Sequence, residues 1–250
     1  MGSVAHAVLA RADGQARVLA AFAKATYLCA PAGGMVVLTA PGVPRGPLHV
    51  PLAELPHVAS GERVAVVDGG LLIEGTQWYS TAAPWRGIVP DRGALRAAQP
   101  LAADLLRSVP TPELMVPGNL LDTTEALVRQ SDLARVAGLI GGRGTGLTPV
   151  GDDILAGLLF AAWLQGEPAG RAGLRRVARL SQTNPISAAY LDAAAGGQSI
   201  APVHDLSGAL AAGDTGAARR ACAETARFGA SSGDALCYGV LLGLSATTRG

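Results

Sequence analysis

The sequence predicts an α+β protein, with a small β-rich N-terminal region packed on a larger, mostly α-helical C-terminal region. Two observations predict this class. Short apolar runs separated by glycine and proline fill much of the first third of the chain, whereas after Pro90 the apolar residues recur at helical spacing. We therefore expect a β-rich region with one leading helix over residues 1–90, and a helical domain over residues 91–250.

The first region is expected to begin with a helix at about residues 16–28, before its strands. Asp68 and Gly69 lie between two apolar runs and predict a tight hairpin. The expected strands cover residues 35–39, 48–50, 63–67 and 71–74.

The second region is predicted from apolar periodicity and from residues that start and stop helices. The expected helices cover residues 93–108, 123–140, 152–165, 171–180, 185–195, 203–211, 217–228 and 233–245.

Composition excludes several classes of protein. Hydrophobic residues make up 49% of the 250 residues, but no stretch offers about 20 uninterrupted apolar positions, so we expect no membrane span. We also expect no leader segment and a cytoplasmic location. The net charge is +1 and no basic cluster carries interleaved aromatics, so no nucleic-acid partner is expected. The three cysteines have no close spacing, which favours reduced, mostly buried thiols and no zinc site.

The most informative segment runs from Gly141 to Asp153. Its four glycines allow several amide N–H groups to converge on one point, as in anion-binding loops. Thr148 then predicts a helix N-cap and Pro149 the first helical residue. Two acids, Asp152 and Asp153, follow in the first turn, where they complement the helix dipole.

Two interpretations of this loop remain open. It is either an ordinary capped helix start or an anion site in which Arg143 clamps a carboxylate or phosphate with two parallel hydrogen bonds. The segment lacks the Gly-Lys-Ser/Thr of a P-loop, and no strong strand precedes it, so nucleotide binding is not implied.

A similar pattern recurs near the C-terminus. Gly233, Asp234 and Gly239 match Gly151, Asp152 and Gly157 in order and spacing. The glycines inside the expected helices indicate close approach of each helix to the other or to a third helix. Either both helices are core elements with small packing residues, or their starts face one pocket and share an anionic ligand.

Three segments resemble the AllH-like family, which is linked to the oxamate carbamoyltransferase of anaerobic allantoin breakdown. Residues 144–153 resemble the family's Gly-x-Gly-Leu-Thr-Pro-x-Gly-Asp-Asp signature, residues 183–191 its Thr-x-x-x-Ser-x-x-x-Leu helix, and residues 231–233 its Thr/Ser-Ser-Gly segment. One departure is that Asp234 directly follows Gly233, whereas the family places its acid one residue later, where this chain has Ala235.

The resemblance implies a subunit or relative of an enzyme that exchanges a carbamoyl group between a small ureide such as oxalurate and phosphate, yielding oxamate and carbamoyl phosphate. It implies a small anionic substrate, phosphate and other carbamoyltransferase subunits as partners. The alternative is a non-catalytic subunit whose loop binds a small anion or holds a complex together.

Carbamoyl transfer needs anion binding, stabilisation of a tetrahedral oxyanion and a proton for the departing nitrogen. Asp152 and Asp153 are the candidate catalytic acids. No cofactor is identified, and Mg²⁺ is conceivable at the two acids although the sequence offers no full ligand set. The expected substrate-binding residues are Arg143, Gly144, Thr145, Gly146, Leu147, Thr148, Gly151, Ser187, Ser231, Ser232, Gly233 and Asp234.

The four histidines are scattered, and no pair has metal-ligand spacing. His204 and Asp205 are adjacent in sequence and would not face each other on a helix, so a catalytic triad is not expected.

Overall fold

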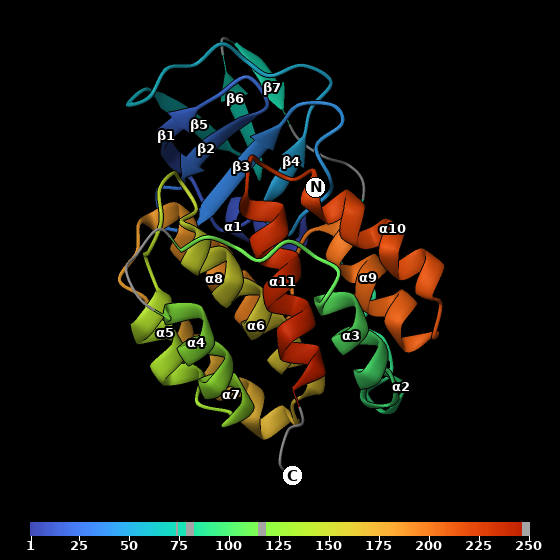
Figure 1. Cartoon of the computed structure of the whole chain (residues 1–250). Helices are drawn as coiled ribbons and strands as arrows, with labels where there is room; N and C mark the ends of the chain where they lie inside the picture. The colour runs from blue at the N-terminus through green and yellow to red at the C-terminus, as the bar shows by residue number, and fades with distance from the viewer. Residues whose placement is uncertain (74, 79–82, 115–118, 247–250) are drawn as a thin grey trace. The chain divides into compact units, whose positions relative to one another are not determined.

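The structure is a computed structural model that describes residues 1–73, 75–78, 83–114 and 119–246 (Figure 1). The chain divides into two compact units, Met1–Arg86 and Gly87–Gly250. The predicted α+β class is confirmed, because the described strands all lie in the first unit and the second unit is helical.

The first unit is built on one sheet with the strand order β4-β3-β2-β1-β5-β6-β7. Neighbouring strands pair antiparallel except β3 and β4, which are parallel. The strands are β1 (Gly14–Ala21), β2 (Ala25–Cys29), β3 (Met35–Thr39), β4 (His49–Pro51), β5 (Arg63–Val67), β6 (Gly70–Ile73) and β7 (Thr76–Trp78).

The predicted strands at 35–39 and 63–67 are confirmed, and those at 48–50 and 71–74 are shifted by one residue, with Glu74 outside the described residues. The predicted hairpin is also confirmed. Val67 pairs with Gly70, and Asp68 and Gly69 have φ values of 51° and 73°. Two successive positive φ values match the type I′ turn that suits the twist of a hairpin.

The helix predicted at residues 16–28 is wrong, because this segment forms β1 and β2. Ala16 and Val18 are buried while Arg17 between them is exposed, which is the alternation of a strand. Pairing of β1 with β2 and β5 outweighs the helix preference of its alanines. The leading helix is instead α1 (Ser3–Leu9), whose Ala5 and Leu9 join the core beside the sheet.

At the centre of the second unit are two helices, α6 and α11, that are buried along most of their length. In Figure 1 they run side by side through the middle of this unit, with α4, α5 and α7 on one side and α2, α3, α9 and α10 on the other. The helices are α2 (Arg92–Ala97), α3 (Gln99–Leu106), α4 (Leu120–Arg129), α5 (Leu133–Ile140), α6 (Val150–Gln165), α7 (Pro168–Ala178), α8 (Pro185–Ala195), α9 (Ala201–Ala211), α10 (Thr215–Ala226) and α11 (Ser232–Ser245).

Six of the eight predicted helices match one observed helix each, within three residues at either end. The other two predictions each span a break. The first breaks at Ala98, just before Pro100 at the start of α3, and the second breaks at Ser131, whose φ is 60°. Proline suits a helix start, and a left-handed residue ends a helix, so each continuous apolar pattern covers two helices.

None of the described helices is long and apolar enough to cross a membrane.

Candidate functional site

Two helical hairpins of the second unit, α5–α6 and α10–α11, share one backbone arrangement. The second residue of each later helix is a glycine, Gly151 or Gly233, packed on the end of the earlier helix. A Cβ would lie 2.0 Å from the Ile140 carbonyl oxygen at Gly151, and 1.9 Å from that of Thr225 at Gly233. No side chain fits at these distances, so glycine is required at both positions for packing.

The backbone hydrogen bonds of the two hairpins match as well. The Gly151 amide donates to the Arg143 carbonyl at 2.9 Å, and the Gly233 amide donates to the Phe228 carbonyl at 2.8 Å. Arg143 and Phe228 each lie three residues after the carbonyl that the glycine contacts. The sequence similarity of the two helix starts therefore corresponds to a repeated structure.

The later helices of the two hairpins cross at their second glycines. A Cβ on Gly157 would lie 2.5 Å from the Leu236 carbonyl oxygen, and one on Gly239 would lie 2.2 Å from that of Ile154. Of the two alternatives that the sequence left open, approach to each other or to a third helix, the structure shows that these glycines let α6 and α11 approach each other. Because both glycines stand six residues after Gly151 and Gly233, the crossing brings the two helix starts to the same end.

At that end the hydroxyl oxygens of Thr148 and Ser232 lie 2.8 Å apart in a hydrogen bond. The sequence assigned Thr148 as the N-cap of α6, but Pro149 holds that position and no side chain caps the helix. The helix therefore starts one residue later than the predicted cap implies. This leaves the Thr148 hydroxyl to bond across to α11 instead of to its own helix.

Asp153 is bonded to both hydroxyls. Burial raises the pKa of Asp153 well above its usual range, and the neighbouring Asp152 adds to this, whereas hydrogen bonds from Ser232 and Thr148 act in the opposite direction. Its Oδ2 atom is buried and has no hydrogen-bond partner among the described residues. A buried carboxyl with a free oxygen beside two hydroxyls is suited to hold a proton and to pass it to a ligand.

Asp152 is buried and has different partners. Its Oδ1 accepts hydrogen bonds from the Gly142 amide and the Ser181 hydroxyl, each at 2.8 Å, and its Oδ2 accepts one from the Thr183 hydroxyl. This carboxylate fastens the glycine loop to the segment before α8. The two adjacent acids thus face different surroundings, as residues about 100° apart on a helix do.

Asn184 ties the same two segments together from the other side. Its Oδ1 caps α8 by accepting hydrogen bonds from the amides of Ile186 and Ser187, at 3.0 and 3.1 Å. Its Nδ2 donates to the Leu147 carbonyl at 2.8 Å. Ser187 itself is buried in the first turn of α8. The hydrogen bonds of Ser181 and Thr183 to Asp152, and of Asn184 to Leu147, hold this segment against the glycine loop.

Three of the four glycines in the loop have a backbone conformation that favours glycine, whereas Gly141 has an ordinary φ of −56°. Gly142, Gly144 and Gly146 all have positive φ, of 71°, 116° and 92°. Thr145 and Gly146 are exposed and Leu147 is half-buried. The Arg143 side chain is exposed, and its Nε donates to the Leu139 carbonyl at 2.7 Å, which satisfies one terminal carbonyl of α5. Its two Nη groups have no ion-pair partner within the described ranges.

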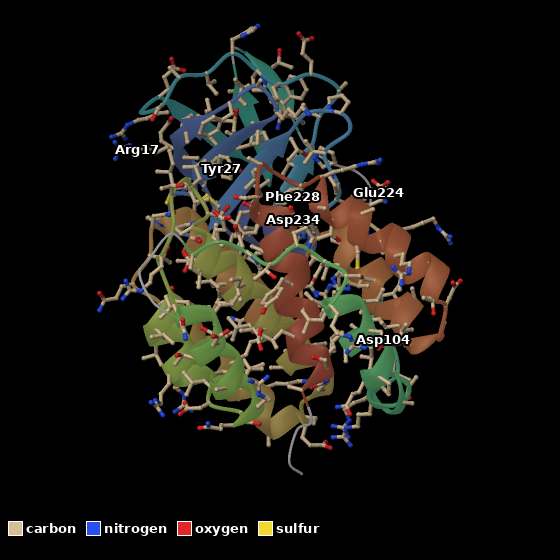
Figure 2. The ribbon with its side chains drawn as sticks, in the orientation of Figure 1. Arg17, Tyr27, Asp104, Glu224, Phe228 and Asp234 are labelled. Carbon is tan, nitrogen blue, oxygen red and sulfur yellow. The ribbon has the colours of Figure 1, made fainter. Side chains whose placement is uncertain are left out.

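The predicted site residues at the start of α11 lie in different surroundings. Ser232 joins Thr148 and Asp153, whereas Asp234 lines a cavity beside Cys222 and Cys237. Ser231 is the exposed N-cap residue of α11, with no side-chain capping bond. Figure 2 shows Asp234 at the N-terminal end of α11, close to Phe228.

Sequence reasoning missed Ser181, which binds Asp152. Its only sequence signal is its position two residues before Thr183, in a polar segment that precedes a helix cap. The unpartnered oxygen of Asp153 had no signal in the sequence, because it depends on what surrounds that side chain in space.

The buried His204 has a structural role. His204 accepts a hydrogen bond from the Ser199 amide at Nε2, at 3.2 Å, and its Nδ1 lies 2.9 Å from the Ile88 carbonyl. These partners fix a neutral ring, in line with a pKa lowered by burial. Within the described ranges, no group of three or more histidine, cysteine or acidic side chains is placed to hold a metal ion.

The segment that contains the glycine loop and the starts of α6 and α11 matches a known protein family. The family model of the oxamate carbamoyltransferase subunit AllH matches residues 139–244, from the end of α5 into the last turn of α11. The resemblance seen in the sequence is confirmed over this segment. Comparison with the curated proteins and with the solved structures gave no match.

Proposed function

Because residues 139–244 match the AllH family model, we propose that this chain is a subunit of an enzyme that transfers a carbamoyl group between a small ureide and phosphate. The proposed reaction converts oxalurate and phosphate into oxamate and carbamoyl phosphate. The proposed partners are the other subunits of such an enzyme. The proposed substrate site lies where the starts of α6 and α11 meet.

The observation that carries this proposal is the cluster of Thr148, Ser232 and Asp153. The positive ends of two helix dipoles meet there, and each attracts an anion. The two hydroxyls, bonded at 2.8 Å, can reorient to donate to a carboxylate or phosphate oxygen. The positive-φ glycines of the adjacent loop allow additional backbone amides to face the same ligand.

The proposed chemistry starts with attack of a phosphate oxygen on the carbamoyl carbon. A tetrahedral oxyanion forms and is stabilised by N–H and O–H donors at the helix starts. The bond to the amide nitrogen of the departing oxamate then breaks, and this nitrogen needs a proton. Asp153 is the proposed donor, because burial raises its pKa and keeps it protonated closer to neutral pH than an ordinary aspartic acid.

Asp152 has a positioning role in this proposal. Its three hydrogen bonds hold Gly142, Ser181 and Thr183 together, so that the glycine loop keeps one shape. Replacing it should therefore alter ligand affinity and stability together, whereas replacing Asp153 should alter turnover with little change in affinity.

The proposal is tested by measuring oxamate release from oxalurate in the presence of phosphate, with the purified chain alone and with its co-purifying subunits. We expect Asp153→Asn to reduce turnover about a hundredfold or more, as loss of a general acid does. Asp192→Asn is the matched control, because Asp192 is a partly exposed carboxylate that pairs with Arg175 at 3.6 Å. Equal loss in both variants, or full activity of Asp153→Asn, would exclude the proposed role.

One observation favours the non-catalytic alternative. Asp152 and the Nε of Arg143 are both engaged in holding the loop and the end of α5, as in a segment built mainly to keep its shape. Calorimetric titration with phosphate, oxamate and oxalurate separates the two functions. Binding without turnover in the complete complex supports an anion-binding subunit, and absence of binding to all three excludes the anion site.

A further inference from the structure

A second chemical feature lies outside the proposed substrate cluster, in a cavity of about 230 Å³ between α3, α10 and α11. Its walls include Leu105 and Val109, and two cysteines, Cys222 of α10 and Cys237 of α11, face it together. Both thiols are buried, with 8% and 2% of their surface exposed. Nothing in the sequence pairs them, because they stand fifteen positions apart along the chain.

The two thiols are in hydrogen-bond contact and are not equivalent. The hydrogen bond from Cys237 lowers the pKa of Cys222, and the positive charge of Arg219 lowers it further, against the effect of burial. Cys237 has its pKa raised, first by the same hydrogen bond, then by burial and by the negative charges of Cys222 and Asp234. Cys222 is thus the more acidic thiol and Cys237 is the proton donor.

The placement of the charges agrees with this assignment. Arg219 lies three residues before Cys222 on α10, and Asp234 lies three residues before Cys237 on α11, so each charge shares a helix face with one thiol. All four residues line the same cavity. Arg219 is exposed while Cys222 is buried, so the cavity leads from solvent to the more acidic sulfur.

We propose that Cys222 and Cys237 form a thiol–disulfide exchange site that reacts with a low-molecular-weight disulfide entering this cavity. The Cys222 thiolate attacks one sulfur of the small disulfide, whose S–S bond breaks to leave a mixed disulfide on Cys222 and one free thiol. Cys237 then loses its proton to solvent and attacks the Cys222 sulfur. The second small thiol leaves, and Cys222 and Cys237 are joined.

The electrons balance in this sequence. The two protein thiols are oxidised to one disulfide, and the small disulfide is reduced to two thiols. The resulting bond would link α10 to α11, next to the loop that leads to Ser232. For this bond to form, the two sulfurs have to come to a separation of about 2.05 Å.

The test exposes the reduced full-length chain to oxidised glutathione and follows intact mass and cysteine-containing peptides by mass spectrometry. In the wild type we expect a Cys222–Cys237 disulfide and no retained glutathione. Cys237→Ser should retain one glutathione on Cys222, because no second thiol is present to release it. Cys222→Ser should slow reaction in this cavity by about tenfold or more, since the remaining thiol is the less acidic one.

Cys29→Ser is the matched control, because it removes a thiol in β2 of the first unit and should behave as the wild type. Thermal melts of each variant establish that the fold is retained. Brief alkylation of the folded wild type with iodoacetamide gives a readout that needs no variant, with Cys222 expected to be labelled before Cys237. Stable glutathione on wild-type Cys222, equal labelling of the two thiols, or no reaction with oxidised glutathione would overturn the proposal.

Discussion

Asp153 has one carboxyl oxygen that is buried without a hydrogen-bond partner in the described part of the chain, while hydroxyls of Thr148 and Ser232 bond to the carboxyl group. Its pKa is raised on folding, so between the ordinary value of 3.8 and the raised value the folded state binds more protons than the unfolded state. The free energy of unfolding therefore falls as pH rises through this window. The helix dipole favours the ionised form, but burial is the larger effect at this position.

We predict that Asp153→Asn removes this pH dependence. Asparagine has the shape of the protonated acid and no charge, so the variant should become steadily more stable relative to the wild type as pH rises from about 4 towards neutral. Urea unfolding of both proteins across this range measures the difference. A gap that stays constant with pH would show that the carboxyl ionises as freely in the folded chain as in the unfolded one.

Arg143 lies between glycines and has an exposed side chain, with only its Nε bonded within the loop. We predict that Arg143→Ala weakens binding of phosphate, oxamate or oxalurate by about a hundredfold, the effect of losing a charge-assisted bidentate contact. Its thermal stability should fall only by the equivalent of about 0.5 to 1 kcal/mol, from the lost bond to Leu139. Calorimetric titration measures the first effect and a thermal melt the second.

Arg135→Ala is the control for Arg143, because Arg135 is an exposed arginine of α5, the helix before the glycine loop, and lies 3.9 Å from Asp132. It should bind the three anions as the wild type does. If both variants bind the three anions equally well, Arg143 is not part of the proposed site, and its role is limited to the hydrogen bond with the end of α5.

The crossing of α6 and α11 depends on glycine. We predict that Gly157→Ala destabilises the protein by about 2 to 3 kcal/mol, because the added methyl would lie 2.5 Å from backbone atoms of Leu236 and Val240. Gly173→Ala in α7 is the matched control, since no atom of the described residues beyond its own helix lies within 4 Å of its added Cβ. That change should stabilise by about 0.5 to 1 kcal/mol through helix propensity. Denaturant midpoints of the two variants moving in the same direction would contradict this packing.

For the protein as a whole, we predict loss of stability in acid, to which the buried His49 contributes. Burial lowers its pKa from 6.5 to about 4, against a bond between its Nδ1 and the Pro44 carbonyl at 2.8 Å. The unfolded chain then binds the proton first, so stability is complete above pH 6.5 and falls by about 3 kcal/mol as pH drops towards 4. His204, whose pKa is also lowered by burial, acts in the same direction.

His49→Asn tests this, because the amide can donate to the Pro44 carbonyl without titrating. Its free energy of unfolding should vary less between pH 6.5 and 4 than that of the wild type, with tryptophan fluorescence as the readout. The same slope in both proteins would assign the acid sensitivity to other groups.

The sequence was enough to predict the α+β class, two strands at their observed bounds and the glycine-rich helix starts. These features are local. Hydrophobic periodicity, turn residues and a run of glycines act over a few neighbouring residues, so Asp68 and Gly69 predict their hairpin wherever they occur in a chain. The family resemblance was also visible, because its motif is one continuous segment from Gly144 to Asp153.

Tertiary pairing determined what local preference could not. Residues 16–28 have helix-forming alanines, yet they become strands because β5 and β3 supply hydrogen-bonding edges on both sides. The bond between Thr148 and Ser232 joins residues 84 positions apart, and only the glycine crossing of α6 and α11 brings them together. Asp152 and Asp153 are identical and adjacent in the sequence, and they differ because one is turned towards three donors and the other leaves a buried oxygen without one. Burial and long-range contact are properties of the packed chain, and for that reason the chemistry of these two acids could be assigned only in three dimensions.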